Sequence, residues 1–306
     1  MKRNTKLSQR AESIWQKKES LGFAIVRYAV LAGIGFVFLY PVLYMAVNSL
    51  KSVEDLVDPS VEWLPTGICF DNFVKAFKTL DFGPSFWNSV VTAVLPALLQ
   101  TFSCAIVGYG LARFPVPGKN FWIVMIVATF VVPTQITLIP KYLMFSNYKM
   151  LDTILPLIVP ALLGQGLKSS LFVLVFWNFF SSYPQSLDEA AFIDGANTLT
   201  VFFKVALPLA KPAIVVTILF SLVWYWNETT QSSLLFGTLI KTLPMKLGSF
   251  ADSYQNLYGG GVSASSINEA VSLAGTFLSI APLLILYLIL QRQFVESIEK
   301  VGITGE

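Results

Sequence analysis

Six long apolar stretches, separated by polar segments, dominate the pattern of hydrophobic and polar positions along the chain. They fall at residues 21–50, 86–111, 121–145, 153–180, 212–233 and 270–290. Each one reaches the roughly 20 apolar residues that a helix needs to cross the hydrocarbon core of a bilayer. The pattern therefore predicts an all-α, polytopic membrane protein with six transmembrane helices.

The fourth stretch is interrupted by the polar sequence Gly164-Gln165-Gly166, and Lys168 follows closely behind. Polar, glycine-containing backbone at membrane depth is tolerated only where it lies against protein or water. We therefore expect this break to face the interior of the helix bundle.

The polar segment 51–84 carries six acidic residues against three lysines. Its pattern predicts a short helix near residues 71–79 and a position outside the cell. The segment has two interpretations, a docking surface for an extracytoplasmic partner or a solvated loop. A second external loop, rich in glycine and serine, is expected at residues 259–266.

Basic residues are concentrated in the first twenty positions, where six lysines and arginines face two glutamates. The positive-inside rule places such a tail in the cytoplasm. Six spans then place the C-terminus, the loop with Arg113 and Lys119, and residues 181–211 on that same side. The expected organisation is a tail at 1–20, a membrane domain at 21–292 and a second cytoplasmic tail at 293–306.

Composition excludes several classes of function. The chain is 55% hydrophobic and 13% charged, with no histidine and a net charge of +3. The lack of histidine removes the commonest metal ligand and the usual general base, and the lack of a basic block beyond the tail argues against nucleic-acid binding. No phosphate-binding loop is present, and we expect Cys69 and Cys104 to be unpaired. We therefore expect no enzyme activity, metal or cofactor in this chain.

Residues 181–211 form a polar segment between two apolar stretches. Ser186, followed three residues later by Glu189, fits a capping box, which predicts a short helix that begins near residue 187. Ala190 and Ala191 leave one helix face shallow enough for another protein to approach closely. Gly195 supplies the left-handed residue that ends the helix.

A second amphipathic run follows at residues 199–207, and Pro208 and Pro212 reset the backbone before the next apolar stretch. From the residues alone, an ordinary loop with two surface helices is a better interpretation than a docking site.

The 181–211 loop resembles the EAA loop of binding-protein-dependent ABC importer permeases. The matching positions are Glu189, Ala190, Ala191, Asp194, Gly195, Leu207 and Pro208, with Val205 where isoleucine is usual. In that family the loop is the coupling helix, which sits in a cleft on the cytoplasmic ATPase and passes its motion to the membrane helices. The resemblance implies that Glu189 faces a basic residue of the ATPase and that Gly195 forms the turn between two helices.

Most of the chain is similar to the carbohydrate branch of these permeases, the maltose-type second subunit. The matching motifs are Asn88-Ser89, Val132-Pro133, Leu138-Ile139-Pro140, Asp194-Gly195-Ala196, Lys211-Pro212 and Trp226-Asn227-Glu228. The resemblance implies the type I ABC importer permease fold. From Glu296 onward the chain departs from the family pattern, so we expect no contact of its tail with the ATPase.

The implied function is translocation of a sugar, as an oligosaccharide, through a bacterial inner membrane by alternating access. The implied partners are two cytoplasmic ATPase subunits, which bind ATP and magnesium, a second homologous permease, an extracytoplasmic binding protein, and membrane lipid. Both termini would be cytoplasmic.

A sugar in a membrane cavity needs amide and hydroxyl partners and an aromatic face. The candidates for the substrate pathway are Asn88, Gln135, Gln165, Lys168, Trp226 and Asn227. Lys168 and Trp226 also have structural alternatives, because a lysine can snorkel to an interface and tryptophans near the end of a span are often interfacial anchors.

Two further functions remain open at this point. An ABC permease for a solute other than sugar would share the fold and the loop. An ion-coupled secondary transporter would use Lys168 and Glu228 as coupling charges and would need no ATPase.

Overall fold

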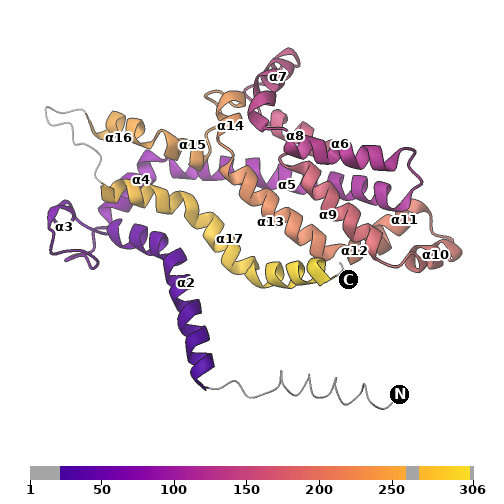
Figure 1. Cartoon of the computed structure of the whole chain (residues 1–306). Helices are drawn as coiled ribbons and strands as arrows, with labels where there is room; N and C mark the ends of the chain where they lie inside the picture. The colour runs from indigo at the N-terminus through magenta and orange to yellow at the C-terminus, as the bar shows by residue number, and fades with distance from the viewer. Residues whose placement is uncertain (1–20, 260–268, 304–306) are drawn as a thin grey trace.

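The structure is a computed structural model that describes residues 21–259 and 269–303, and every regular element in these ranges is a helix (Figure 1). The long helices are α2 (Leu21–Asn48), α5 (Phe82–Arg113), α13 (Lys211–Asn227) and α17 (Glu269–Ile303). The expected all-α class is confirmed, and α17 continues without a break through residue 293, where we had placed the start of a tail.

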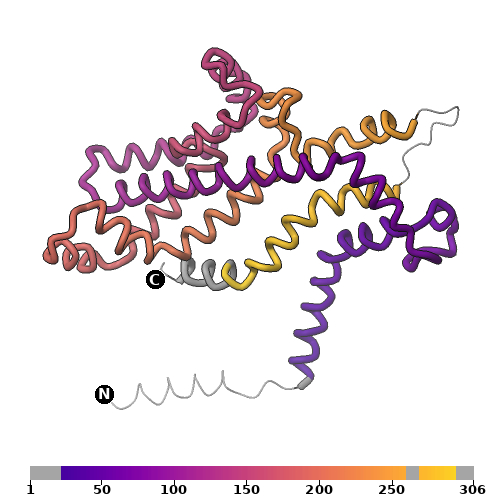
Figure 2. Tube along the Cα trace, turned by 180° about the vertical axis from the view of Figure 1, so that it is seen from behind, coloured from indigo at the N-terminus to yellow at the C-terminus, as the bar shows by residue number. Residues whose placement is uncertain are grey.

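Helix α5 is the axis of the bundle, with α8 (Leu155–Leu162), α9 (Ser169–Ser182) and α13 packed around it. Its approach to α9 depends on Gly108, where an added Cβ would lie 2.5 Å from the Cβ of Phe176. Helix α17 packs against α13 on another side of the bundle and also contacts α2. Helix α2 diverges from the others, as Figures 1 and 2 both show, and most of its surface is exposed.

The expected count of six spans is only partly met. Three helices, α2, α5 and α17, are long and apolar enough to cross a membrane, and two bent helix pairs raise the count to five. The remaining expected span, the fourth stretch at 153–180, is divided between α8 and α9, neither of which is long enough alone. The break at Gly164-Gln165-Gly166 that separates them was predicted.

A second break was not predicted. The stretch 121–145 consists of α6 (Lys119–Val131) and α7 (Thr134–Asn147), which meet at an angle of 96°. Pro133 lies between them and has no amide hydrogen to continue the helix, and it drives Val132 into an extended conformation. The fifth stretch is also shorter than expected, because α13 ends at Asn227 and α14 (Thr230–Leu235) is a separate helix.

The segment 51–84 is held by internal hydrogen bonds. It contains α3 (Val53–Val57) and α4 (Asp71–Thr79), and α4 matches the predicted short helix. The buried Lys51 ammonium donates to the carbonyls of Val61 and Glu62, at 2.9 and 2.8 Å. The segment is therefore an ordered cap on this end of the bundle.

The two ends of the bundle carry different small helices. Helices α3, α4, α15 (Leu243–Gly248) and α16 (Phe250–Tyr258) lie toward one end, and the 181–211 loop lies at the other (Figures 1 and 2). The expected glycine and serine-rich loop at 259–266 lies outside the described residues except for Gly259. The basic tail at 1–20 lies wholly outside them. Arg113 contacts Asp188, so the loop that follows α5 and the 181–211 loop share one end, as the charge pattern predicts.

Two candidate functional sites

The first candidate site is the 181–211 loop, which folds as two short helices joined by a tight turn. The first helix, α10 (Ser186–Ile193), ends as predicted at Gly195, whose φ is +83°. The Gly195 amide donates to the Phe192 carbonyl and the Ala196 amide to the Ala191 carbonyl, each at 3.0 Å. These two bonds form a Schellman motif, in which the left-handed residue is most easily glycine.

The predicted capping box at the start of α10 is wrong. Gln185 is the residue before the helix, its backbone is already helical, and no side chain caps the first amides. The preceding turn at Pro184 leads the chain directly into the helix, so Ser186 is a helical residue and its hydroxyl is not at the capping position.

The second helical run is continuous but irregular. Asn197 caps α11 (Thr198–Val201) by accepting a hydrogen bond of 2.8 Å from the Thr200 amide. A π-helical turn, η1 (Phe202–Ala206), then leads into α12 (Leu207–Leu209), which contains Leu207 and Pro208. A proline crowds the carbonyl four residues before it, and the wider π turn accommodates this crowding. The run bends by 75° into α13, where Pro212 was expected to restart the chain.

The outer face of the loop is apolar although the loop is polar overall. Leu187, Phe192 and Leu199 are each at least 43% exposed, and Ile193 is 86% exposed. The motif residues Glu189, Ala190 and Asp194 are also exposed, whereas Ala191 is half-buried. Exposed apolar side chains next to polar ones are a feature of interaction surfaces, so this loop is a candidate docking site.

The inner face of the loop is fixed to α5 by three side chains, which we name the loop junction: Arg113, Tyr183 and Asp188. The Arg113 Nε lies 3.1 Å from the Asp188 carboxylate, and both side chains are at most 9% exposed. The Tyr183 hydroxyl donates to the same carboxylate at 2.6 Å, while Arg113 donates to the Tyr183 carbonyl at 2.8 Å and lies 3.8 Å from its ring centroid. Burial and the hydrogen bond to Asp188 raise the pKa of Tyr183.

The second candidate site lies at the break between α8 and α9. Four residues, Gln100, Leu167, Ser221 and Tyr225, form what we name the central junction. The Tyr225 hydroxyl donates to the Gln100 side-chain oxygen at 2.6 Å, and the Gln100 amide donates to the Leu167 carbonyl at 2.7 Å. The Leu167 amide donates to the Tyr225 hydroxyl at 3.1 Å. Backbone released by the break is thus satisfied by α5 and α13, which confirms that the break faces the bundle interior.

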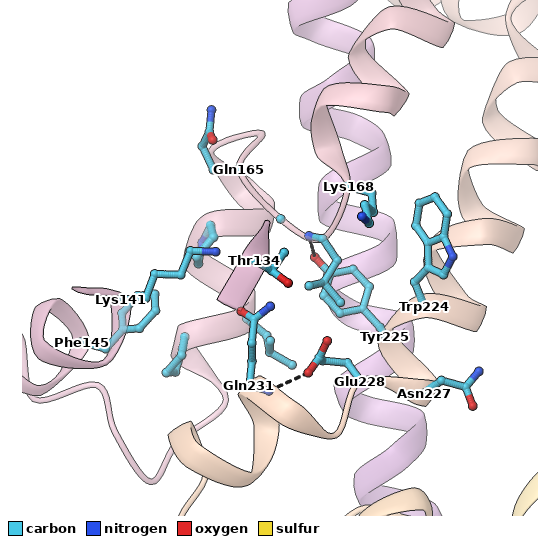
Figure 3. A pocket seen from close by; sticks show the side chains of 15 residues that line it. Thr134, Lys141, Phe145, Gln165, Lys168, Trp224, Tyr225, Asn227, Glu228 and Gln231 are labelled. Carbon is cyan, nitrogen blue, oxygen red and sulfur yellow. Dashed lines mark hydrogen bonds between the residues drawn. The ribbon is translucent and has the colours of Figure 1, made fainter. Parts of the chain in front are cut away.

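A cavity of about 310 Å³ adjoins the central junction, and we name it the lysine cavity because Lys141 and Lys168 line it. Figure 3 shows Lys141 entering from α7, opposite α13, and Lys168 from the end of the break. The other polar lining residues are Thr134, Gln165, Tyr225, Asn227, Glu228 and Gln231. A second cavity of about 400 Å³ shares both lysines with it and extends to the start of α9. The break at Pro133 and the break between α8 and α9 therefore open onto one space, which both polar and apolar side chains line.

The six expected pathway residues are divided by the structure. Gln165, Lys168 and Asn227 line the lysine cavity, although the Asn227 amide also donates to the Val223 carbonyl of its own helix. The other three residues do not line it. Asn88 donates to the Lys241 carbonyl, Gln135 is exposed on α7, and Trp226 is buried in the apolar core against Phe86.

Sequence reasoning missed Lys141 and Asp188. A lone lysine inside the apolar stretch 121–145 is itself a signal, because charged residues within membrane segments usually have a function. No comparable local signal identifies Asp188, since its partner Arg113 lies 75 positions earlier in the chain.

Comparison with known proteins identifies the family. The family model described as binding-protein-dependent transport system inner membrane component matches residues 104–300. The probable ABC transporter permease protein YurM of Bacillus subtilis is 29% identical over 268 residues, which cover 87% of this chain and 84% of that protein. The diacetylchitobiose uptake system permease protein NgcG of Streptomyces coelicolor is 27% identical and covers 91% of this chain and 88% of its own length.

Two further matches extend the similarity. The arabinooligosaccharides transport system permease protein AraQ of Halalkalibacterium halodurans is 26% identical over 90% of this chain and 94% of its own. In a crystal structure of a bacterial ABC transporter involved in the import of the acidic polysaccharide alginate, one chain superimposes with a TM-score of 0.66 at 23% identity. That match covers 90% of this chain and 99% of the other, and it confirms the importer permease fold.

Proposed function

Because the chain belongs to the family of binding-protein-dependent transport system inner membrane components, we propose that it is a permease subunit of an ATP-driven sugar importer. The substrate class is taken from its relatives, which include permease proteins for the uptake of diacetylchitobiose and of arabinooligosaccharides. The chain carries no nucleotide site of its own in this proposal. Two partner ATPase subunits bind ATP and magnesium, and a second permease and an extracytoplasmic binding protein complete the importer in the bacterial cytoplasmic membrane.

The observation that carries the proposal is the construction of the 181–211 loop. Its outer face offers Ile193 and neighbouring apolar side chains to a partner, while its inner face is fixed to α5 through Asp188. A loop that transmits movement needs both features. It must bind the partner on one face, and it must be attached to a membrane helix on the other. In our proposal this surface docks on the ATPase, and Glu189 contributes the charged contact.

In the proposed mechanism, the contacts of the loop with α5 link ATP binding to alternating access. When ATP closes the ATPase dimer, the loop moves with its docking cleft, and α5 transmits that movement to the central junction beside the lysine cavity. The cavity then opens to receive sugar from the binding protein. Membership of the family favours this scheme over the ion-coupled carrier that Lys168 and Glu228 allowed from sequence alone, whereas a non-sugar substrate remains compatible with the loop.

The test compares two aspartate substitutions at exposed aliphatic residues on opposite ends of the bundle. Ile193→Asp, at 86% exposure, places a charge in the docking surface, and Val57→Asp, at 76% exposure, is the matched control on α3. The subunit is co-expressed with its operon, purified in detergent and analysed for co-purifying proteins. We expect the ATPase with wild type and with Val57→Asp, and its loss with Ile193→Asp.

A parallel assay measures ATP-driven oligosaccharide uptake in proteoliposomes. Uptake should follow recovery of the ATPase across the three proteins. Uptake by wild type without ATP or an ATPase would contradict the proposed function, and full ATPase recovery with Ile193→Asp would contradict the role of the loop.

A further inference from the structure

Lys141 and Lys168 have no ionic partner in the part of the chain that the structure describes, where neither ammonium lies within 4.0 Å of a carboxylate. A charged side chain at membrane depth is costly, and such residues usually pair or line a functional path. Lys168 is exposed, and within residues 21–259 and 269–293 its ammonium has only the ring of Phe130, at 5.4 Å, as a close electrostatic contact. Lys141 interacts at longer range with the carboxylate of Glu228, so the protein balances the charge of these two ammonium groups only in part.

Glu228 is the one acidic residue among those that line the lysine cavity, and it already has a local role. Its carboxylate accepts a hydrogen bond of 2.6 Å from the backbone amide of Gln231, close to the start of α14, as Figure 3 shows. A single carboxylate also leaves the cavity with an excess of positive charge. Figure 3 places Glu228 below Lys168 and across from Lys141.

The start of α9 adds a third feature that favours an anion. Helix α9 begins directly after Lys168, has 14 residues, and has no side-chain cap on its first amides. Helix N-termini carry partial positive charge and free N–H groups, which is why anions bind there. Ser169, the first helical residue, is 3% exposed and lines the second cavity, and its hydroxyl has no hydrogen-bond partner.

We infer that the lysine cavity and the second cavity together bind the carboxylate of an acidic oligosaccharide, held by Lys141, Lys168 and the Ser169 hydroxyl. The sugar hydroxyls would meet the neutral polar side chains of the lysine cavity, and Trp224 would offer a ring face. The inference rests on the proposed function, because it specifies the sugar that the importer carries. The central junction supports the site by fixing the backbone just before Lys168.

The test measures equilibrium binding of a labelled short oligouronide to the purified importer in lipid nanodiscs, with the binding protein omitted. The competitors are the same oligouronide as its methyl ester, which keeps the shape and removes the charge, and a neutral oligosaccharide of equal length. We expect the free acid to compete at least about tenfold better than the ester, the factor that one charge-assisted hydrogen bond provides.

Substitutions then identify the side chains that bind the carboxylate of the sugar. Lys141→Gln and Lys168→Gln should each weaken binding of the acid about tenfold or more and leave the ester unaffected, and the difference should shrink as salt is raised. Lys246→Gln, on α15 outside both cavities, is the matched control and should behave as wild type. Ser169→Ala should lower the affinity for the acid by a smaller factor.

Equal competition by acid, ester and neutral sugar, or unchanged affinity in both lysine variants, would overturn the inference. ATP-driven uptake separates this failure from failure of the proposed function. If neutral oligosaccharides are taken up with ATP and oligouronides are not, the importer stands and its acidic substrate is refuted. If neither class is taken up with ATP and all partners present, the proposed function itself fails.

Discussion

The central junction and the loop junction solve one problem in two ways, since each fixes a loop against α5. Gln100 and Arg113 lie on that helix about 20 Å apart along its axis. The central junction is neutral and closes over the backbone of Leu167, whereas the loop junction holds the ionised pair of Arg113 and Asp188.

The difference matches the surroundings of each junction. Neutral hydrogen bonds avoid the desolvation of charges, which suits a junction in the membrane interior that supports a cavity. A buried ion pair is costly to break on one side only, which suits the proposed mechanism, in which the loop moves together with α5. Helix α5 thereby connects the proposed docking surface at one end to the lysine cavity deeper in the bundle.

Gly166→Val tests the central junction and should have the largest effect. A Cβ at this position would overlap the Gln100 side-chain oxygen and the Tyr225 hydroxyl and approach the Ala161 Cα to 3.1 Å. Crowding and loss of buried hydrogen bonds together should cost about 3–5 kcal/mol of stability. Thermal unfolding of the detergent-solubilised protein measures this, with Gly110→Val as control, because a Cβ at Gly110 meets no atom within 4 Å. Equal melting temperatures for the two variants would refute this role of the central junction.

Asp188→Leu tests the loop junction and should cost about 3–5 kcal/mol, because it leaves the buried Arg113 charge without a partner. The double variant Arg113→Met with Asp188→Leu should recover most of that stability, since it removes both charges. ATP hydrolysis should no longer respond to substrate in either protein. A double variant that is stable and still fully coupled would show that α5 receives the movement of the loop by another route.

The sequence predicts local features of both junctions and neither of their long-range contacts. The break at Gly164-Gln165-Gly166 and the turn at Gly195 follow from backbone rules that act within a few residues, and both are found. The bend at Pro133 follows from the same rules, but it was not predicted, because the apolar stretch around it is long enough to be read as one continuous span. Hydropathy averages over such a stretch, whereas one proline is enough to turn the chain.

The contacts between distant residues could not be predicted. Gln100 contacts Tyr225 across 125 positions, and Arg113 contacts Asp188 across 75. A single sequence does not show which residues of distant helices come into contact. The candidate pathway list failed to include Lys141 for a related reason. Because α7 turns sharply away from the axis of α6, Lys141 lines the same cavity as Lys168.

Gly195→Ala tests the turn on the outer side of the loop junction and should cost about 1–2 kcal/mol, the strain of a left-handed residue that carries a Cβ. Gly195→Asn should cost less, because asparagine tolerates this conformation. The control is Gly248→Ala, at a glycine without positive φ and with open space around its Cβ. We expect a lower melting temperature and weaker ATPase recovery for the alanine variant, and identical behaviour of all three variants would exclude a role for the turn.

Tyr183→Phe is the mildest change and separates the hydrogen bond from the ion pair within the loop junction. Its loss should cost about 1 kcal/mol at neutral pH. Because burial and Asp188 raise the pKa of Tyr183 above its ordinary value of 10.0, the folded protein favours the neutral phenol. The stability that this phenol contributes is fully present below pH 10 and is lost as the pH rises through the folded-state pKa. Wild type should therefore lose stability more steeply than Tyr183→Phe above pH 10 in thermal unfolding. Parallel curves would mean that folding does not raise the pKa of Tyr183.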